Sequence, residues 1–231
     1  MFFYMGVVCW ATMTRTFLRA RRPEHKQQRR EAILAAAREL AAASGVRNVS
    51  LGAVAEAVGL AKSNVVRYFG TREEIYLVLT VEEYRSWAEA VTGRLRTARD
   101  MDDVVAALAE TIVERPLLCD LLSHSSVSLE HNVSVEAART YKLGVVTMIG
   151  ELGVQVARAS HLTEAEGREL VGAAAGTAGL LYPAANPPRV LAEVYAQEPE
   201  LARHCPQLLP TLRRFLAALA AGLPTLRPPA G

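Results

Sequence analysis

The sequence has few cysteines and lacks the short motifs that mark common enzyme sites. Its three cysteines, Cys9, Cys119 and Cys205, are odd in number and widely spaced, and none belongs to a CxxC pair. This set argues against a disulfide framework or a zinc site and fits the reducing cytoplasm. The chain contains no Gly-x-Ser-x-Gly elbow, phosphate-cradling glycine-rich loop or HExxH motif. We therefore predict a protein that is not an enzyme and has no cofactor.

Two histidines offer one alternative to this interpretation. His124 and His131 are seven residues apart, so they could share a helix face, and Glu130 is nearby. A metal site is one interpretation of this group, and exposed or otherwise satisfied histidines are the simpler one. Stoichiometric zinc or iron in the purified protein would favour the metal.

A long apolar segment is also lacking at the N-terminus. Phe2 to Thr12 is apolar but too short for a membrane span. The arginines follow this stretch, whereas a signal peptide carries its positive charge before the apolar region. We interpret residues 1–22 as a disordered leader or a mis-assigned start, with Met5 and Met13 as alternative starts, and predict no targeting.

Aromatic residues make up only 6% of the chain, and no run alternates convincingly with a period of two. Alanine and leucine are abundant and recur at helical spacing, so the sequence predicts an all-α fold of nine or ten helices. The predicted helices cover residues 26–43, 50–58, 62–69, 71 onward, 100–114, 117–129, 134–159, 163–182, 187–196 and 206–221. Pro183 is expected to end the eighth of these helices.

Charge is unevenly distributed, although the net charge is only +2. Residues 1–72 hold 12 Lys and Arg against 4 Asp and Glu, whereas residues 73–231 hold 14 against 20. A basic head on an acidic body is typical of a phosphate-binding module joined to one that does not bind nucleic acid. We predict a DNA-binding head at 23–70, a helical body at 71–223 and a loose tail at 224–231.

Residues 51–70, LGAVAEAVGLAKSNVVRYFG, meet the requirements of a helix-turn-helix together. Ala55 is the small residue needed where the helices cross, and Gly59 tolerates the positive φ of the tight turn. The apolar side chains expected to hold the two helices together are Val54, Val58, Leu60, Val65 and Tyr68. An ordinary helical hairpin is the alternative.

The second of these helices carries a polar face. Lys62, Ser63, Asn64 and Arg67 lie near its start or on its outer side, where a recognition helix contacts base edges. Asn suits adenine, Lys or Arg suits guanine, and Ser pairs with either. A solvated helix face is the alternative for each residue alone, and the group beside a helix-turn-helix favours DNA.

The segment from Arg30 to Leu79 resembles the tetracycline-repressor (TetR) family. The resemblance rests on four marks over about fifty residues, which are RREAILAAARELAAASG, SLGAVAEAVGL, a short recognition helix ending in Tyr-Phe, and the Thr-Arg-Glu-Glu-Ile opening of the next helix. It implies a sequence-specific repressor that binds a pseudo-palindromic operator as a homodimer and is released by a small-molecule effector. Activation stays open, as does a helical interaction module that has lost DNA binding.

The resemblance also assigns roles to individual residues of the head. It implies phosphate contacts by Ser50, which also caps the second helix, and by Tyr68 and Arg72. Base contacts fall to Lys62, Ser63 and Asn64, with Arg67 at another groove-facing position. Two departures weaken the pattern, since Ala61 replaces the usual capping Ser and Val66 replaces an aromatic residue that commonly reaches the backbone.

A basic run before the first helix either adds an arm along the phosphates or forms a merely soluble tail. It consists of Arg19, Arg21, Arg22, Lys26, Arg29 and Arg30. If this run binds, it steepens the salt dependence of affinity without changing sequence preference.

In the body, the resemblance implies that helices 163–182 and 206–221 pair across a dimer. The first helix is rich in small residues that allow close approach, and packing within one subunit is the alternative for them. The predicted effector pocket comprises Tyr84, Trp87, Leu118, Leu122, Leu129, Tyr141, Met148 and Leu180, with Ser125, His131 or Glu151 as polar groups. Most of these residues are equally interpretable as core.

Overall fold

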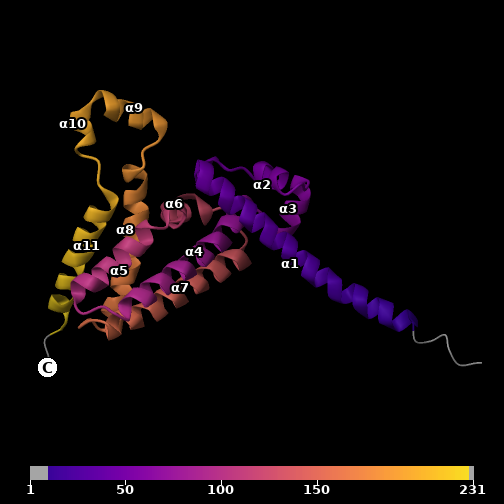
Figure 1. Ribbon diagram of the computed structural model, residues 1–231, viewed down its shortest axis with the longest axis horizontal. Coiled ribbons are helices and arrows are strands. Elements are labelled where there is room, and N and C mark those ends of the chain that lie inside the picture. The colour runs from indigo at the N-terminus through magenta and orange to yellow at the C-terminus, as the bar shows by residue number, and fades with distance from the viewer. Residues whose placement is uncertain (1–9, 229–231) are drawn as a thin grey trace, which may run out of the picture.

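The computed structural model describes residues 10–228, which contain helices and no β-strand (Figure 1). The predicted all-α fold is confirmed. The helices of this range are α1 (Trp10–Ser44), α2 (Leu51–Ala57), α3 (Lys62–Phe69), α4 (Arg72–Leu95), α5 (Met101–Val113), α6 (Pro116–His124), α7 (Val135–Arg158), α8 (Glu164–Ala185), α9 (Arg189–Gln197), α10 (Pro199–Ala202) and α11 (Leu208–Gly222). Three short helical segments complete it, η1 (Val46–Asn48), η2 (Ser125–Leu129) and η3 (Leu223–Leu226). None of the described helices is long and apolar enough to cross a membrane.

The head consists of α1, α2 and α3, and its helix-turn-helix has the predicted form. Ser50 caps α2, since its Oγ accepts a hydrogen bond from the Ala53 N–H at 3.0 Å. Gly59 has a φ of 64° in the turn, and the next residue's N–H donates to the Ala55 carbonyl at 2.9 Å. The left-handed glycine therefore closes α2 and redirects the chain into α3.

Helices α4 and α8 both begin with a Thr-x-x-Glu sequence, the pattern of a capping box, but only one of the two boxes is complete. At α8, the Thr163 Oγ1 accepts the Glu166 N–H, and the Glu166 carboxylate accepts the Thr163 N–H in return. At α4, the Thr71 Oγ1 accepts the Glu74 N–H, but the Glu74 carboxylate accepts the Ser134 N–H at 2.8 Å. The α4 box is thus only half formed, because the start of α7 takes its carboxylate.

Pro183 does not end α8, contrary to the prediction. The helix continues to Ala185, with Pro183 exposed inside its last turns. A proline removes one backbone donor near a helix end, while the buried Ala178 and Leu181 keep this part of α8 packed on the body.

The two ends of the chain are more structured than the sequence indicated. Residues 10–22, assigned to a disordered leader, continue α1 in the N-terminal direction, and residues 1–9 lie outside the described residues. In the C-terminal segment assigned to a loose tail, Arg227 pairs with Glu166 at 2.6 Å and donates to the His161 carbonyl, and residues 229–231 lie outside the described residues. This hydrogen-bonded pair lowers the pKa of Glu166 to about 2.

Two hydrophobic clusters share α4. The head cluster joins Ile33 of α1 and Val65 of α3 to Ile75 in the first turn of α4. The body cluster contains Trp87 and other residues from the second half of α4, together with α5, α6, α7, α8 and α11. Since one continuous helix contributes to both clusters, α4 connects the position of the head to the packing of the body.

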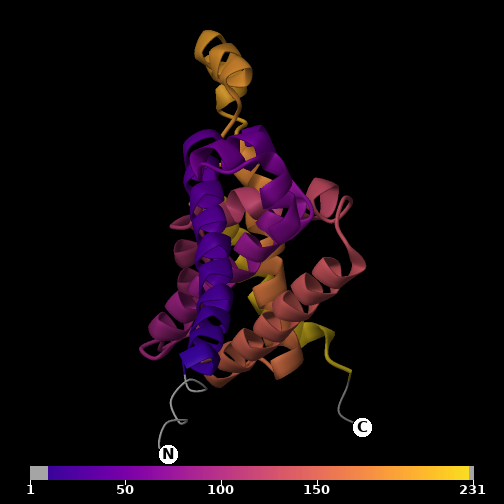
Figure 2. The same ribbon diagram turned by 90° about the vertical axis from the view of Figure 1, so that its right-hand side faces the viewer.

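The segment between α8 and α11 forms an arm of α9 and α10. It projects from the rest of the molecule in both views (Figures 1 and 2). Neither helix contains a buried residue. The predicted helix at 187–196 is therefore present as α9, but it does not contribute to the core.

The turn glycine provides a stability test. Gly59→Ala should lower the free energy of unfolding by about 1 kcal/mol, because an L side chain is strained at this positive φ although nothing lies within 4 Å of the added Cβ. Gly52→Ala, in the first turns of the neighbouring α2, is the control and should raise it by about 0.5 kcal/mol. Urea unfolding measures both, and equal effects at the two positions would contradict the assigned turn geometry.

Candidate nucleic-acid interface and effector cleft

Helix α3 lies at the surface of the head with its polar residues outward. Val65 and Phe69 are buried in the head cluster, at 0% and 3% exposure. On the other side, four residues of the predicted DNA-contacting set are exposed, namely Lys62, Ser63, Asn64 and Arg67. The apolar face thus anchors α3, and its N-terminal turn is free to approach another molecule.

The N-terminus of α3 lacks a side-chain cap, as the departure at Ala61 predicts. Val66, the other departure, is 41% exposed on the outer side of the helix. It presents a short apolar group where a phenol would otherwise offer a hydrogen bond. The outer face of α3 is therefore polar mainly through Lys62 to Asn64 and through Arg67.

A basic concavity adjoins α3. It has a volume of about 470 Å³ and is lined by Lys26, Arg29, Leu60, Asn64, Arg67 and Tyr68. No carboxylate lines it, so its three cations are not neutralised within the concavity. Two of these cations belong to the basic run of the sequence, and they lie on α1 beside α3 rather than on a separate arm. This arrangement suits the negatively charged backbone of a nucleic acid.

Arg30, which follows Arg29 on α1, is bound within the head. Its Nη1 donates to the Tyr68 carbonyl at 3.3 Å, and its guanidinium lies 4.2 Å from the centroid of the Phe69 ring. It therefore ties α1 to the C-terminal end of α3.

Arg72 has an internal role that the sequence did not reveal. Its Nε donates to the Val49 carbonyl at 2.5 Å, another nitrogen donates to the Val46 carbonyl, and Nη1 pairs with Glu73 at 3.0 Å. The guanidinium also lies over the Tyr76 ring. These contacts fix the segment between α1 and α2 to the start of α4, so the side chain is occupied where the resemblance implied a phosphate contact.

Asp120 of α6 connects the body to the same segment. Its Oδ2 accepts the Val46 N–H at 2.7 Å, and its Oδ1 lies 3.5 Å from His124 Nε2. Burial alone would raise the pKa of Asp120, but the hydrogen bonds from His124 and Val46 outweigh burial and lower it. Among the described residues, no group of three potential ligands could hold a metal ion around His124 or elsewhere.

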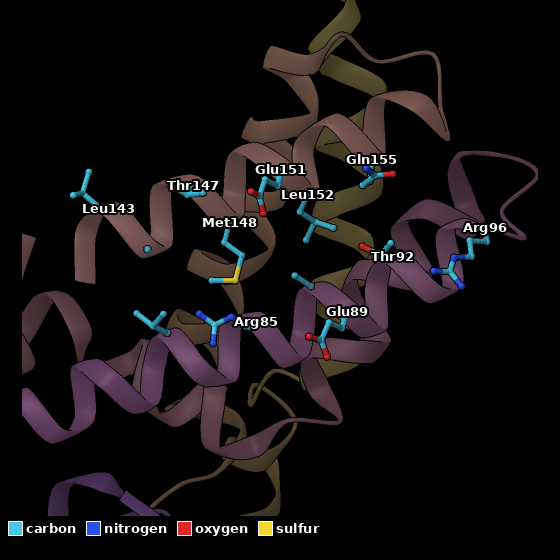
Figure 3. A pocket seen from close by; sticks show the side chains of 13 residues that line it. Arg85, Glu89, Thr92, Arg96, Leu143, Thr147, Met148, Glu151, Leu152 and Gln155 are labelled. Atoms are coloured by element: carbon cyan, nitrogen blue, oxygen red, sulfur yellow. The ribbon is translucent and has the colours of Figure 1, made fainter. Parts of the chain in front are cut away.

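The body contains an open cleft between α4 and α7. Figure 3 shows the side chains that line this cleft, whose volume is about 880 Å³. Met148 and Glu151 of the predicted effector pocket line it, with Met148 directed toward α4. The remaining lining residues are Val81, Arg85, Ala88, Glu89, Thr92, Arg96, Leu143, Gly144, Thr147, Leu152 and Gln155.

The other residues of the predicted pocket are dispersed. Tyr84, Trp87, Leu118 and Leu129 are buried in the hydrophobic clusters, where the Trp87 Nε1 donates to a threonine hydroxyl of α5. Leu122 is partly buried against the body cluster, and the Ser125 hydroxyl donates to the Leu121 carbonyl. Tyr141 lines a second cleft near the head. His131 is exposed.

Leu180 cannot line an internal pocket of this chain. It is 76% exposed on the outer face of α8. Its neighbours Ala178, Gly179 and Leu181 occupy the inward positions of the helix instead.

Comparison with known proteins agrees with this geometry. Residues 33–79 match the family described as "Bacterial regulatory proteins, tetR family", and residues 81–227 match "Tetracyclin repressor-like, C-terminal domain". The chain belongs to the TetR family. It is accordingly a transcription regulator and not an enzyme. No curated protein is similar enough in sequence to count as a relative.

Two solved structures share the fold of this TetR-family regulator. The fatty acid degradation regulator FadR from Bacillus halodurans is 14% identical, with a TM-score of 0.52, over 84% of this chain and 98% of that one. Thermus thermophilus FadR, described as a TetR-family transcriptional repressor in complex with lauroyl-CoA, is 18% identical, with a TM-score of 0.54, over 87% and 98%. At these identities the likeness establishes the fold.

Sequence reasoning missed several cleft residues of this TetR-family chain, notably Arg85 and Arg96. A signal for them existed, because Val81, Arg85, Glu89, Thr92 and Arg96 are spaced three or four residues apart and so lie on one face of α4. What the sequence did not reveal is that a cleft lies between this face of α4 and α7.

Replacing Arg72 or Arg67 by alanine should change the free energy of unfolding by different amounts. Arg72→Ala should lower the free energy of unfolding by about 2 kcal/mol, because it leaves two backbone carbonyls without their charged donor. Arg67→Ala, at an exposed position on α3, should change it by less than about 0.5 kcal/mol. Thermal unfolding monitored by circular dichroism distinguishes them, and an unchanged stability for Arg72→Ala would show that its internal bonds do not hold the head.

Proposed function

We propose that this regulator binds DNA by placing α3 in the major groove. The outward exposure of Lys62, Ser63 and Asn64 at the start of α3 carries the proposal. These three residues are assigned to base edges, with Arg67 contacting a further base one turn later. The two-part organisation, a head at 23–70 and an effector-binding body from residue 71, belongs to the same proposal.

Phosphate contacts are assigned to the residues around the recognition helix. Ser50 is exposed at the N-terminus of α2, and Tyr68 lines the basic concavity together with Lys26 and Arg29. Helix N-termini and clustered cations both attract phosphate oxygens. Arg72 is assigned a positioning role, because its donors hold the backbone that precedes α2.

We further propose a homodimer formed through the outer faces of α8 and α11. On α8, a Cβ added at Gly172 or Gly176 would meet nothing within 4 Å, and Leu180 is exposed. On α11, Phe215 is 50% exposed. Large apolar side chains beside small residues are what a close helix pairing buries. A two-fold dimer of this kind reads a pseudo-palindromic operator with its two heads.

The cleft between α4 and α7 is the proposed effector site. It combines apolar side chains such as Met148 and Leu152 with Arg85 and Arg96 and with the carboxylates of Glu89 and Glu151. This mixture suits an amphipathic small molecule. A ligand that prefers the conformation unable to bind DNA lowers operator affinity by the difference, which makes the protein a repressor released by its effector in the cytoplasm. Because the Thermus thermophilus FadR structure of the same fold is a complex with lauroyl-CoA, an acyl thioester is the first candidate.

Selection from random DNA tests the assignment of α3. The wild-type protein should enrich a pseudo-palindrome, and Lys62→Ala or Arg67→Ala should change the preferred bases with about tenfold loss of affinity for the original site. Arg158→Ala, exposed at the far end of α7, is the control and should change neither preference nor affinity.

The same selected DNA tests repression and release. Lauroyl-CoA added to the complex should dissociate it in a gel-shift experiment. If the α3 variants bind DNA more weakly but prefer the same bases, those residues contact the DNA backbone and not the bases. Failure to enrich any sequence would contradict the regulator's proposed mode of binding.

Leu180 and Val135 form a matched pair for testing the dimer, since both are 76% exposed. Leu180→Asp should weaken the dimer by at least about tenfold, because it places a carboxylate in a buried interface. Val135→Asp, at the start of α7, should leave self-association unchanged. Sedimentation equilibrium measures both, and a dimer unaffected by Leu180→Asp would exclude α8 as the pairing surface.

A further inference from the structure

Helix α6 is packed between the head and the body. Leu121 belongs to the head cluster, and Leu117, one turn earlier, is partly buried against it. Leu118 belongs to the body cluster, and Leu122, again one turn away, packs against that cluster. Residues four apart lie on the same side of a helix, so α6 presents one side to the head and another to the body. Like α4, this helix therefore belongs to both clusters.

Asp120 of α6 holds the backbone that precedes α2. Its Oδ2 accepts the N–H of Val46 at 2.7 Å, and Val46 is fully buried in the head cluster. From α4, Arg72 donates to the carbonyls of Val46 and Val49. Ser50, the cap of α2, follows directly in the chain. A carboxylate of α6 and a guanidinium of α4 thus hold the same short segment of the head.

The body side of α6 lies very close to α8. A Cβ added at Gly179 would come within 2.9 Å of the Leu122 Cβ and 3.0 Å of its backbone carbon. Gly179 is buried, whereas the next residue, Leu180, is 76% exposed on the face of α8 that we propose for the dimer. Packing this close leaves α6 no room to move toward α8. The position of α8 therefore limits where α6, and with it Asp120, can lie.

We propose that Asp120 is a positioning residue for DNA binding. Through the N–H of Val46 it sets the position of the head relative to α8, and hence the distance between the two recognition helices of the dimer. This inference rests on the proposed homodimer and on the proposed binding through α3. Asp120 itself does not contact DNA. Without its carboxylate, a buried N–H loses its acceptor, one link between the head and α8 is lost, and the two heads adopt a wider range of separations.

Selection from random DNA with the full chain measures this distance as the spacing between half-sites. The wild-type protein should enrich pseudo-palindromes with one dominant spacing. Asp120→Ala should enrich the same half-sites at several spacings and bind the wild-type spacing about tenfold more weakly. Asp120→Asn keeps a side-chain oxygen that can accept the Val46 N–H, so it should restore the single spacing.

Asp103→Ala is the matched control for Asp120→Ala. The Asp103 Oδ2 also accepts a backbone N–H, that of Arg99 at 2.8 Å, but it does so within the body. Asp103→Ala should therefore keep the single wild-type spacing. A merely structural role of Asp120 would lower the affinity for every spacing alike, and that result would overturn the proposal.

Gly179→Ala tests the same connection from the α8 side. The added methyl group displaces α6 without changing Asp120 or the head, so the dominant spacing should shift or broaden. Gly150→Ala on α7 is the control, because nothing lies within 4 Å of its added Cβ, and it should keep the wild-type spacing. If Asp120→Ala does not fold, as judged by circular dichroism, Gly179→Ala decides the question alone.

The positioning role and the proposed function fail in different ways. A wild-type spacing in both Asp120→Ala and Gly179→Ala would overturn the role of Asp120 and leave binding through α3 in place. A wild-type protein that enriches no pseudo-palindrome would instead contradict the proposed dimeric DNA binding, and the inference would fail with it.

Discussion

The position of the recognition helix depends on the anchoring of one apolar face of α3 in the head cluster. Val65 and Phe69 are buried against α1 and the start of α4, which leaves Lys62 to Asn64 outside. A helix that must present a polar face needs an apolar one to hold it, because a helix of eight residues is not stable alone. The exposure of the proposed DNA-contacting residues therefore follows from how the head packs.

Helix α4 extends this constraint to the body. Its first turns lie in the head cluster and its later turns in the body cluster, while Arg72 and Asp120 hold the intervening backbone from two sides. We propose that a change in the packing of the body reaches the head through this continuous helix. The proposed effector cleft lies between this helix and α7.

Local sequence rules predicted the head well. Gly59, Ser50 and the apolar spacing of α3 each act within a few residues, so their effect can be read without tertiary information. The rules failed where a distant segment intervened. Glu74 leaves its capping box for the start of α7, Arg227 fixes the supposed tail to Glu166, and the packing of α8 overrides the break expected at Pro183.

In the candidate sites, too, local patterns predicted some residues, whereas others depend on distant segments of the chain. The exposed residues of α3 follow from helical periodicity, whereas the internal contacts of Arg72 depend on carbonyls more than twenty residues away. The cleft could not be predicted, because it depends on the spacing between α4 and α7, which no pattern in either helix specifies. Buried aromatic residues such as Tyr84 and Trp87 were placed in the pocket because core and pocket residues share the same composition.

Protection of guanine N7 atoms from methylation probes the placement of α3, since these atoms lie in the major groove. We expect two protected patches on selected DNA, about 34 Å apart along one face of the duplex, and loss of protection when Asn64 and Arg67 are replaced by Ala. Unprotected N7 atoms in a stable complex would contradict the placement of α3 in the major groove.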